Sequence, residues 1–334
     1  MLESSKENFK KLESRLLCIN SNVNNANDMR DMIYDLCVRC NPTLIMATGG
    51  SKVVAYYLQL LLGDQMICEV IEPRDYFYKY DIKKYSNLIV ISASGNTNGV
   101  KEALESFNGL KYLVCEKQRK EEYQIVSWGN DIYDKEHSFI SIASSLGPIA
   151  VMLNITCFGA FKLGIIDDDI KITNEKIVKL LKRSKDIISK LSYSFQDTKV
   201  VQVISGYDTK CSSSTLESNL IEAGLCVPII HDKGSFCHGR SNILSNETPI
   251  IYLSHDYNEL DNTIINSMSD EYHNILKFNT IDIKDEDISW REFYLLLQMY
   301  YLSKKIADDK NKDLTNPNYN RKLVKTLYNY RGRL

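Results

Sequence analysis

The chain has 334 residues, enough for two domains that each bury a full hydrophobic core. Apolar residues make up 44% and charged residues 25%, which is an ordinary globular composition. The net charge is −2 and the basic residues are spread along the chain, so neither nucleic acid nor an anionic membrane is expected as a partner.

Several absences indicate a cytoplasmic protein. No apolar stretch is long enough to span a bilayer, and residues 1–11 are too polar for a secretory signal. The nine cysteines lie scattered in apolar contexts, as is typical of reduced thiols. Cys37 and Cys40 form one C-x-x-C without a second pair or a nearby histidine, so no metal site is expected.

Apolar runs rich in β-branched residues alternate with helical patterns along the chain. The first half predicts strands at 43–46, 67–71, 88–92 and 112–115, and helices at 52–62, 99–107 and 140–163. The pattern breaks around residues 167–174, and 175–193 indicates a connecting amphipathic helix. The second half predicts strands at 199–204, 226–231, 249–254 and 275–278, helices at 213–223, 258–268 and 290–308, and a polar tail from 310.

This alternation predicts an α/β fold with two doubly wound, parallel-sheet domains in tandem, as degenerate copies of one fold. We expect residues 1–170 to form the first domain and residues 171–334 the second, with the tail contributing to the site. Ligands of such sheets bind beyond the carboxyl ends of the strands.

The most informative segment is Ser92-Ala93-Ser94-Gly95-Asn96-Thr97, which separates an apolar strand from a helix. Such a junction offers backbone N–H groups, the positive end of a helix dipole and short hydroxyl donors to a compact anion. A similar junction, Ala47-Thr48-Gly49-Gly50-Ser51, opens at the same sheet edge if the two strands are neighbours. The two loops predict a phosphate site. The alternative is that their hydroxyls only cap helices.

The spacing of the residues in these two junctions excludes two well-known phosphate-binding motifs. Neither junction is a Walker A sequence or a G-x-G-x-x-G fingerprint, and no acidic residue is suitably placed for a ribose. ATP and NAD are therefore poor candidates, and no cofactor is expected.

The loops resemble those of the sugar isomerase (SIS) family of phosphosugar enzymes. Members read S-x-S-G-E/N-T after a strand, as residues 92–97 do, and G-x-S in the preceding loop, as Gly49-Gly50-Ser51 does. A further family segment, A-S-T/S, is similar to Ala143-Ser144-Ser145. The resemblance implies that Gly49, Gly50, Ser51, Ser92, Ala93, Ser94, Thr97 and Ser144 surround the phosphate of a sugar phosphate.

The resemblance extends over about nine-tenths of the chain, to the isomerase portion of the glucosamine-fructose-6-phosphate aminotransferases. Their catalytic Glu precedes a His-Gly by sixteen residues, and Glu222 and His238 keep that spacing. Their C-terminal lysine aligns with Lys322. The resemblance implies that these three residues are catalytic, and Arg240 is a further candidate anion contact.

Three departures bear on the substrate. Asn219 and Phe139 replace a Lys and a Glu of the aminotransferases, and Arg240 replaces the proline after His-Gly. No glutaminase domain precedes the SIS pair, so glutamine-dependent amination is not expected. The resemblance also implies a homodimer, or a dimer of dimers, in which the neighbouring subunit's His segment completes the site.

These residues suit proton transfer between C1 and C2 of a sugar phosphate. A partly buried Glu222 would act as base, His238 would open the ring, and Lys322 would neutralise an enolate or form an imine. An aldose–ketose isomerase is the first hypothesis. A deglycase that releases an amine from a 6-phosphorylated ketosamine is the second, and a non-catalytic sugar-phosphate sensor is the third.

Overall fold

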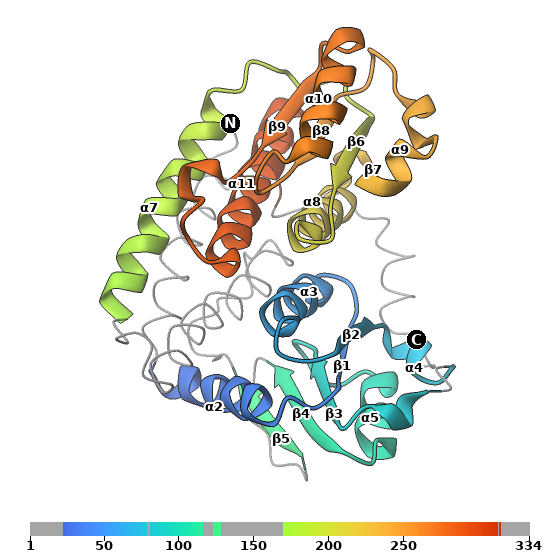
Figure 1. The fold of residues 1–334 in the computed structure, drawn as a ribbon, viewed down its shortest axis with the longest axis vertical. Coiled ribbons are helices and arrows are strands. Elements are labelled where there is room, and N and C mark those ends of the chain that lie inside the picture. The colour runs from blue at the N-terminus through green and yellow to red at the C-terminus, as the bar shows by residue number, and fades with distance from the viewer. Residues whose placement is uncertain (1–22, 79–80, 116–122, 128–169, 313, 315–334) are drawn as a thin grey trace. The chain divides into compact units, whose positions relative to one another are not determined.

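The computed structural model describes residues 23–78, 81–115, 123–127, 170–312 and 314. The chain divides into two compact units between Ile177 and Val178. Each unit contains one parallel β-sheet (Figure 1). The predicted boundary at residues 170 and 171 lies seven residues earlier, and the predicted helix at 140–163 lies outside the described residues.

The first unit holds a five-stranded parallel sheet with the strand order β2-β1-β3-β4-β5. Its strands are β1 (Thr43–Ala47), β2 (Cys68–Ile71), β3 (Asn87–Ile91), β4 (Leu110–Cys115) and β5 (Gln124–Ser127). Its helices are α2 (Val23–Arg39), α3 (Ser51–Leu62), α4 (Pro73–Tyr76) and α5 (Asn98–Ser106), with a short 3₁₀ turn η1 (Ile82–Lys84). The sequence predicted β1 to β4 but neither β5 nor α2.

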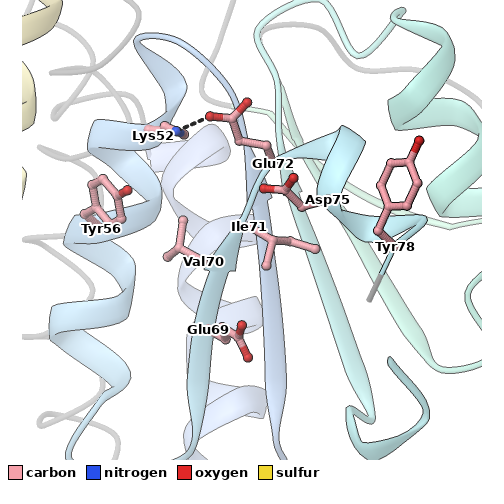
Figure 2. A pocket seen from close by; sticks show the side chains of 8 residues that line it. All are labelled: Lys52, Tyr56, Glu69, Val70, Ile71, Glu72, Asp75 and Tyr78. Atoms are coloured by element: carbon pink, nitrogen blue, oxygen red, sulfur yellow. Dashed lines mark hydrogen bonds and ion pairs between the residues drawn. The ribbon is translucent and has the colours of Figure 1, made fainter. Parts of the chain in front are cut away.

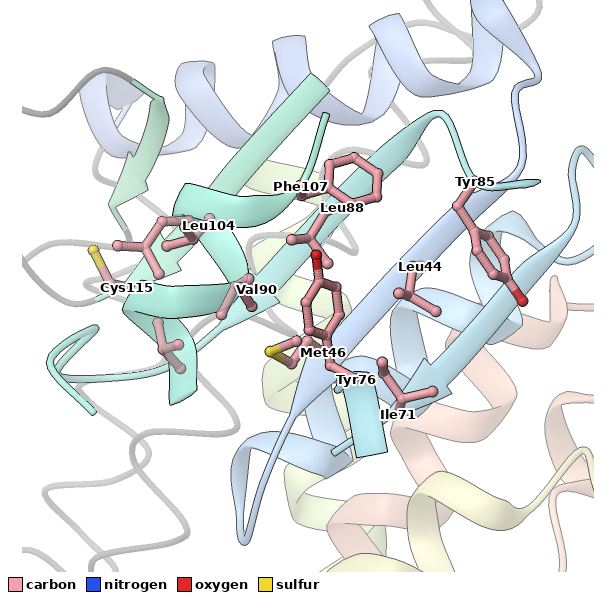
Figure 3. Close-up of a cluster of buried hydrophobic side chains, with 13 residues drawn as sticks. Leu44, Met46, Ile71, Tyr76, Tyr85, Leu88, Val90, Leu104, Phe107 and Cys115 are labelled. Atoms are coloured by element: carbon pink, nitrogen blue, oxygen red, sulfur yellow. The ribbon is translucent and has the colours of Figure 1, made fainter. Parts of the chain in front are cut away.

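Both faces of this sheet are covered. Every residue of β1 and β3 is buried, as expected for parallel strands enclosed between two helical layers. One face packs against α4 and α5 in a core cluster around Leu44, Val90, Tyr76 and Leu104 (Figure 3). Because right-handed crossovers leave β1 and β3 in opposite directions, α3 covers the other face.

The second unit holds a four-stranded parallel sheet with the order β7-β6-β8-β9. Its strands are β6 (Val200–Ser205), β7 (Val227–Asp232), β8 (Ile250–Leu253) and β9 (Ile275–Phe278). Its helices are α8 (Lys210–Glu222), α9 (Lys233–Cys237), α10 (Glu259–Glu271) and α11 (Ile288–Asp309), with 3₁₀ turns η3 (Arg240–Ile243) and η4 (Ile281–Ile283). The connecting helix α7 (Ile170–Ser189) begins five residues before the predicted start.

The order of these strands matches that of the first four strands of the first sheet. One face packs against α9 and α10, through a cluster that includes Ile204, Phe236, Tyr252 and Ile264. The helix α8 contributes nothing to that cluster and packs instead against α11. The crossovers from β6 to β7 and from β7 to β8 run in opposite directions, which places α8 and α9 on opposite faces.

Candidate functional site

The two predicted anion loops lie side by side at one edge of the first sheet. β1 and β3 are neighbouring parallel strands, with Ala47 paired to Ile91 at their carboxyl ends. The connections that follow them lead to opposite faces, so the loops diverge at the topological switch point of the sheet. This is the place where open α/β sheets bind ligands.

The loop after β3 is held in shape by its own serine. The amide of Gly95 donates to Ser92 Oγ at 3.1 Å, and Gly95 has a left-handed backbone with φ of 58°. A longer contact of 3.4 Å joins the amide of Asn96 to Ser94 Oγ. Both amides therefore already have a hydroxyl partner within the loop. Because the Ser92 hydroxyl accepts this bond, its own proton stays available for donation.

Neither helix uses a side chain of these loops as its cap. Thr97 is the N-cap residue of α5 and has the extended backbone of a cap, but its hydroxyl makes no capping bond. Gly50 occupies the same position before α3, and that helix also lacks a side-chain cap. Helix capping therefore does not account for the hydroxyl of Thr97 or Ser51.

In the loop after β1, the glycines leave the backbone open to the close approach of a ligand. Gly49 has φ of 55°, and a Cβ atom there would meet nothing within 4 Å. The amides of Ser51, Lys52 and Val53 donate to the carbonyl groups of residues 48–50. The hydroxyls of Thr48 and Ser51 are therefore the stronger candidate donors for an anion here.

The other predicted phosphate contacts divide between the described and the undescribed parts of the chain. Ser92 and Ala93 are half-buried, whereas Ser94 and Thr97 are exposed. Ser144 and Lys322 lie outside the described residues.

Glu222 is the last residue of α8 and is half-buried. Burial raises the pKa of its carboxyl, and a hydrogen bond from Ser218 Oγ to Glu222 Oε1 at 2.7 Å opposes that rise. A raised pKa suits a carboxylate that must take up a proton near neutral pH. The expectation of partial burial is confirmed.

His238 and Arg240 are exposed residues of the connection that follows β7. His238 is the C-cap residue directly after α9, and its amide donates to the carbonyl of Ser235 at 3.2 Å. Gly239 then adopts φ of 104°, and η3 begins at Arg240. The turn that follows His238 therefore depends on a glycine.

One chain does not bring Glu222 and His238 together. Glu222 ends α8 on one face of the second sheet, near the edge where β7 begins. His238 follows α9 on the other face, after the end of β7. A site that uses both residues must draw them from two chains.

The sequence did not predict a buried polar network at the carboxyl edge of the second sheet. His255 Nε2 lies 3.2 Å from Glu292 Oε2, and the amide of Ser212 donates to Glu292 Oε1 at 2.7 Å. Both ionisable side chains are almost fully buried. The polar residues directly after the predicted strand at 249–254 could have indicated this network. The carboxylate of Glu292 thus lies at the amino end of α8. This helix follows β6 in the second sheet as α3 follows β1 in the first.

A hollow of about 480 Å³ also lies at the carboxyl end of β2 (Figure 2). We call it the β2 hollow, and its polar lining residues are Lys52, Tyr56, Glu69, Glu72, Asp75 and Tyr78. The run of acidic residues after the predicted strand at 67–71 was the signal that could have found it.

The described residues contain neither a candidate metal site nor a candidate membrane span. Within them, no three His, Cys, Asp or Glu side chains gather in a way that could hold a metal ion. Across the same residues, none of the helices has the length and apolar character to cross a bilayer.

The similarities between this chain and known proteins are similarities to solved structures. No protein-family model and no curated protein matches the sequence. A Clostridium difficile protein named provisionally as a phosphosugar isomerase has a TM-score of 0.70 and 16% identity, covering 96% of this chain and 97% of that one.

Two further structures have names that include specific reactions. The C-terminal domain of glucosamine-fructose-6-phosphate aminotransferase from Francisella tularensis has a TM-score of 0.66 and 14% identity, with 92% of this chain and 97% of that chain covered. Glucosamine-6-phosphate deaminase from Thermotoga maritima has a TM-score of 0.64 and 12% identity, covering 92% and 98%. The chain therefore has the α/β fold with parallel sheets that these phosphosugar proteins share.

Proposed function

We propose that this chain is an enzyme that processes a sugar phosphate, with two SIS-type domains in tandem over residues 1–170 and 171–334. The observation that carries the proposal is the pair of loops after β1 and β3. They meet at the switch point of the first sheet, and the hydroxyls of Thr97 and Ser51 are not used as helix caps. A phosphate is the compact anion that such hydroxyls and helix amino ends suit.

In this proposal the phosphate is bound by Ser51, Ser92, Ser94 and Thr97, with Ser144 as a further contact. Glu222 transfers the proton between C1 and C2, because burial raises the pKa of its carboxyl. His238 opens the sugar ring, and Lys322 stabilises the developing negative charge. Arg240, two residues beyond His238, is a further anion contact.

The proposed active unit is a homodimer. Glu222 and His238 lie on opposite faces of the second sheet in one chain, so each site would combine Glu222 of one chain with His238 of the other. A dimer of dimers would contain the same pairing.

An aldose–ketose isomerase is the first candidate reaction, and the amine-releasing deglycase is the second. The names of the matched structures include an isomerase, an aminotransferase and a deaminase, so the shared fold favours neither reaction. A sensor without catalysis would need the phosphate loops but not Glu222. Retained sugar-phosphate binding with no turnover of any hexose or fructosamine 6-phosphate would favour the sensor.

The test compares hexose 6-phosphates with the same sugars lacking phosphate, by thermal shift and calorimetry. A specific ligand stabilises only the folded state, so the phosphorylated sugars are expected to raise the melting temperature. Thr97→Val should weaken that binding about ten-fold, because a hydrogen bond to a charged group is lost. Thr263→Val is the matched control, since Thr263 is also exposed but lies on α10. Equal binding of phosphorylated and plain sugars would overturn the proposal.

Products then separate the two reactions. Ketose-to-aldose conversion without amine release supports the isomerase. Amine release from a fructosamine 6-phosphate without such conversion supports the deglycase.

A further inference from the structure

From the β2 hollow we infer that the substrate carries a positively charged organic group beyond its phosphorylated sugar, and that this hollow receives it. The inference rests on the proposed function, because it concerns the part of the substrate that lies next to the phosphate loops.

The hollow and the phosphate loops open at the same edge of the sheet. β1 and β2 are neighbouring parallel strands, with Met46 paired to Ile71, so Thr48 and Glu72 leave the sheet on the same side. Neighbouring strands lie about 4.8 Å apart. Lys52, on the wall of the hollow, directly follows the predicted phosphate ligand Ser51. One extended ligand can therefore reach both places.

The charge of the hollow excludes a second phosphate. The carboxylates of Glu72 and Asp75 lie beside the single ammonium group of Lys52, whereas that of Glu69 is turned toward Tyr85 on the other face of the sheet. Lys52 is already ion-paired with Glu72, and this partner raises the pKa of the lysine against the opposing effect of burial. The positive charge of Lys52 is thus compensated, and the remaining field is negative.

The carboxylate of Asp75 is the best candidate to bind a cation. Asp75 is exposed on α4 and lies close enough to Lys52 to act on its pKa. Within the described residues, no hydrogen bond or ion pair engages the Asp75 carboxylate. Glu69, by contrast, accepts a hydrogen bond from the hydroxyl of Tyr85.

Two aromatic rings also favour a cation in the hollow. Tyr56 lies on the α3 side of the hollow and Tyr78 on the side beyond α4 (Figure 2). The face of a tyrosine ring attracts an organic cation, and its edge covers the methylene groups that carry one. Carboxylates between two tyrosines therefore favour an alkylammonium group over a neutral hydroxyl group.

The test uses two ligands that differ in one charge. The fructosamine 6-phosphates of pentylamine and of cadaverine have the same chain length, but only the second ends in a free ammonium group. We expect the cadaverine derivative to bind more tightly, by about five-fold, as for a partly exposed ion pair. Asp75→Asn should remove most of this difference and leave the affinity for the pentylamine derivative unchanged.

Asp64→Asn is the matched control, because Asp64 is an exposed aspartate just after the carboxyl end of α3, away from the hollow. Equal affinities of the two derivatives for the unmodified protein would overturn the inference. So would a loss in Asp75→Asn that is the same for both ligands. Failure of the proposed function looks different, because then glucose 6-phosphate and both derivatives would all fail to bind.

Discussion

Glu222 and His238 lie at opposite ends of β7 and on opposite faces of its sheet. Glu222 closes α8 five residues before the strand begins, and His238 follows six residues after it ends. The strand spans about 16 Å at ~3.3 Å per residue, which is far beyond hydrogen-bonding reach. If both residues act on one substrate molecule, as proposed above, different chains must supply them.

Mixed dimers test this separation directly. Glu222→Gln and His238→Asn should each lower turnover at least about 100-fold, the lower range for a lost acid or base. Co-expressed in equal amounts, the two variants should recover about a quarter of the original activity. Half of the dimers are then mixed, and each contains one site with both residues intact.

The control is co-expression of two differently tagged copies of Glu222→Gln, which should recover nothing. If the mixed dimers form but stay inactive, the shared site is wrong.

The pH profile of kcat/KM should report Glu222 as a base. Burial raises the pKa of this carboxyl, so activity should rise with pH through a value above that of an ordinary glutamate. Ser218→Ala removes the hydrogen bond that lowers the pKa, and the acidic limb should move to higher pH. Ser214→Ala, one turn earlier on α8, should leave the limb in place. An unchanged limb in Ser218→Ala would contradict the role of Glu222.

Uniform burial makes β1 and β3 the most evident strands in the sequence. β1 and β3 appear as continuous apolar runs because both of their faces are enclosed, and the polar loops after them mark their ends. β5 was not predicted because its four residues, Gln124–Ser127, contain only two apolar side chains between two polar ones and lie outside any long apolar run. The continuous apolar run that marks β1 and β3 in the sequence is thus missing from β5.

The spatial relationships between residues far apart in the sequence could be established only from the structure. Glu222 and His238 are only sixteen positions apart in the sequence, yet the directions of two crossovers place them on opposite faces of the sheet. Likewise, Glu292 meets Ser212 from 80 residues away, on a helix that is buried nearly all round. No hydrophobic period marks such a residue, because every face of α11 from Ser289 to Ser303 is enclosed.

Gly49→Ala tests the approach of a phosphate to the loop after β1. Alanine in a left-handed backbone should destabilise the protein by about 1 kcal/mol, although its Cβ meets no atom. Gly224→Ala is matched, because Gly224 has φ of 60° and equally open space. Both variants should lose similar stability in urea, but only Gly49→Ala should bind sugar phosphates more weakly. Similar affinities in the two variants would place the phosphate away from Gly49.

The pair formed by His255 and Glu292 should make stability depend on pH. Burial lowers the pKa of His255, but the hydrogen bond and charge of Glu292 outweigh it and raise that pKa above 6.5. The stabilisation is therefore fully present below pH 6.5 and is lost as pH rises through the raised pKa.

Glu292→Gln should lower the unfolding free energy by about 3 kcal/mol near pH 6, because a buried charged partner is removed. It should also flatten the decline in stability as the pH rises above about 6.5. Urea unfolding followed by Trp290 fluorescence measures both effects, in a Trp128→Phe background that leaves one tryptophan near the pair. Glu271→Gln, an exposed substitution on α10, should change neither value. A decline with pH that survives Glu292→Gln would assign the titration to another group.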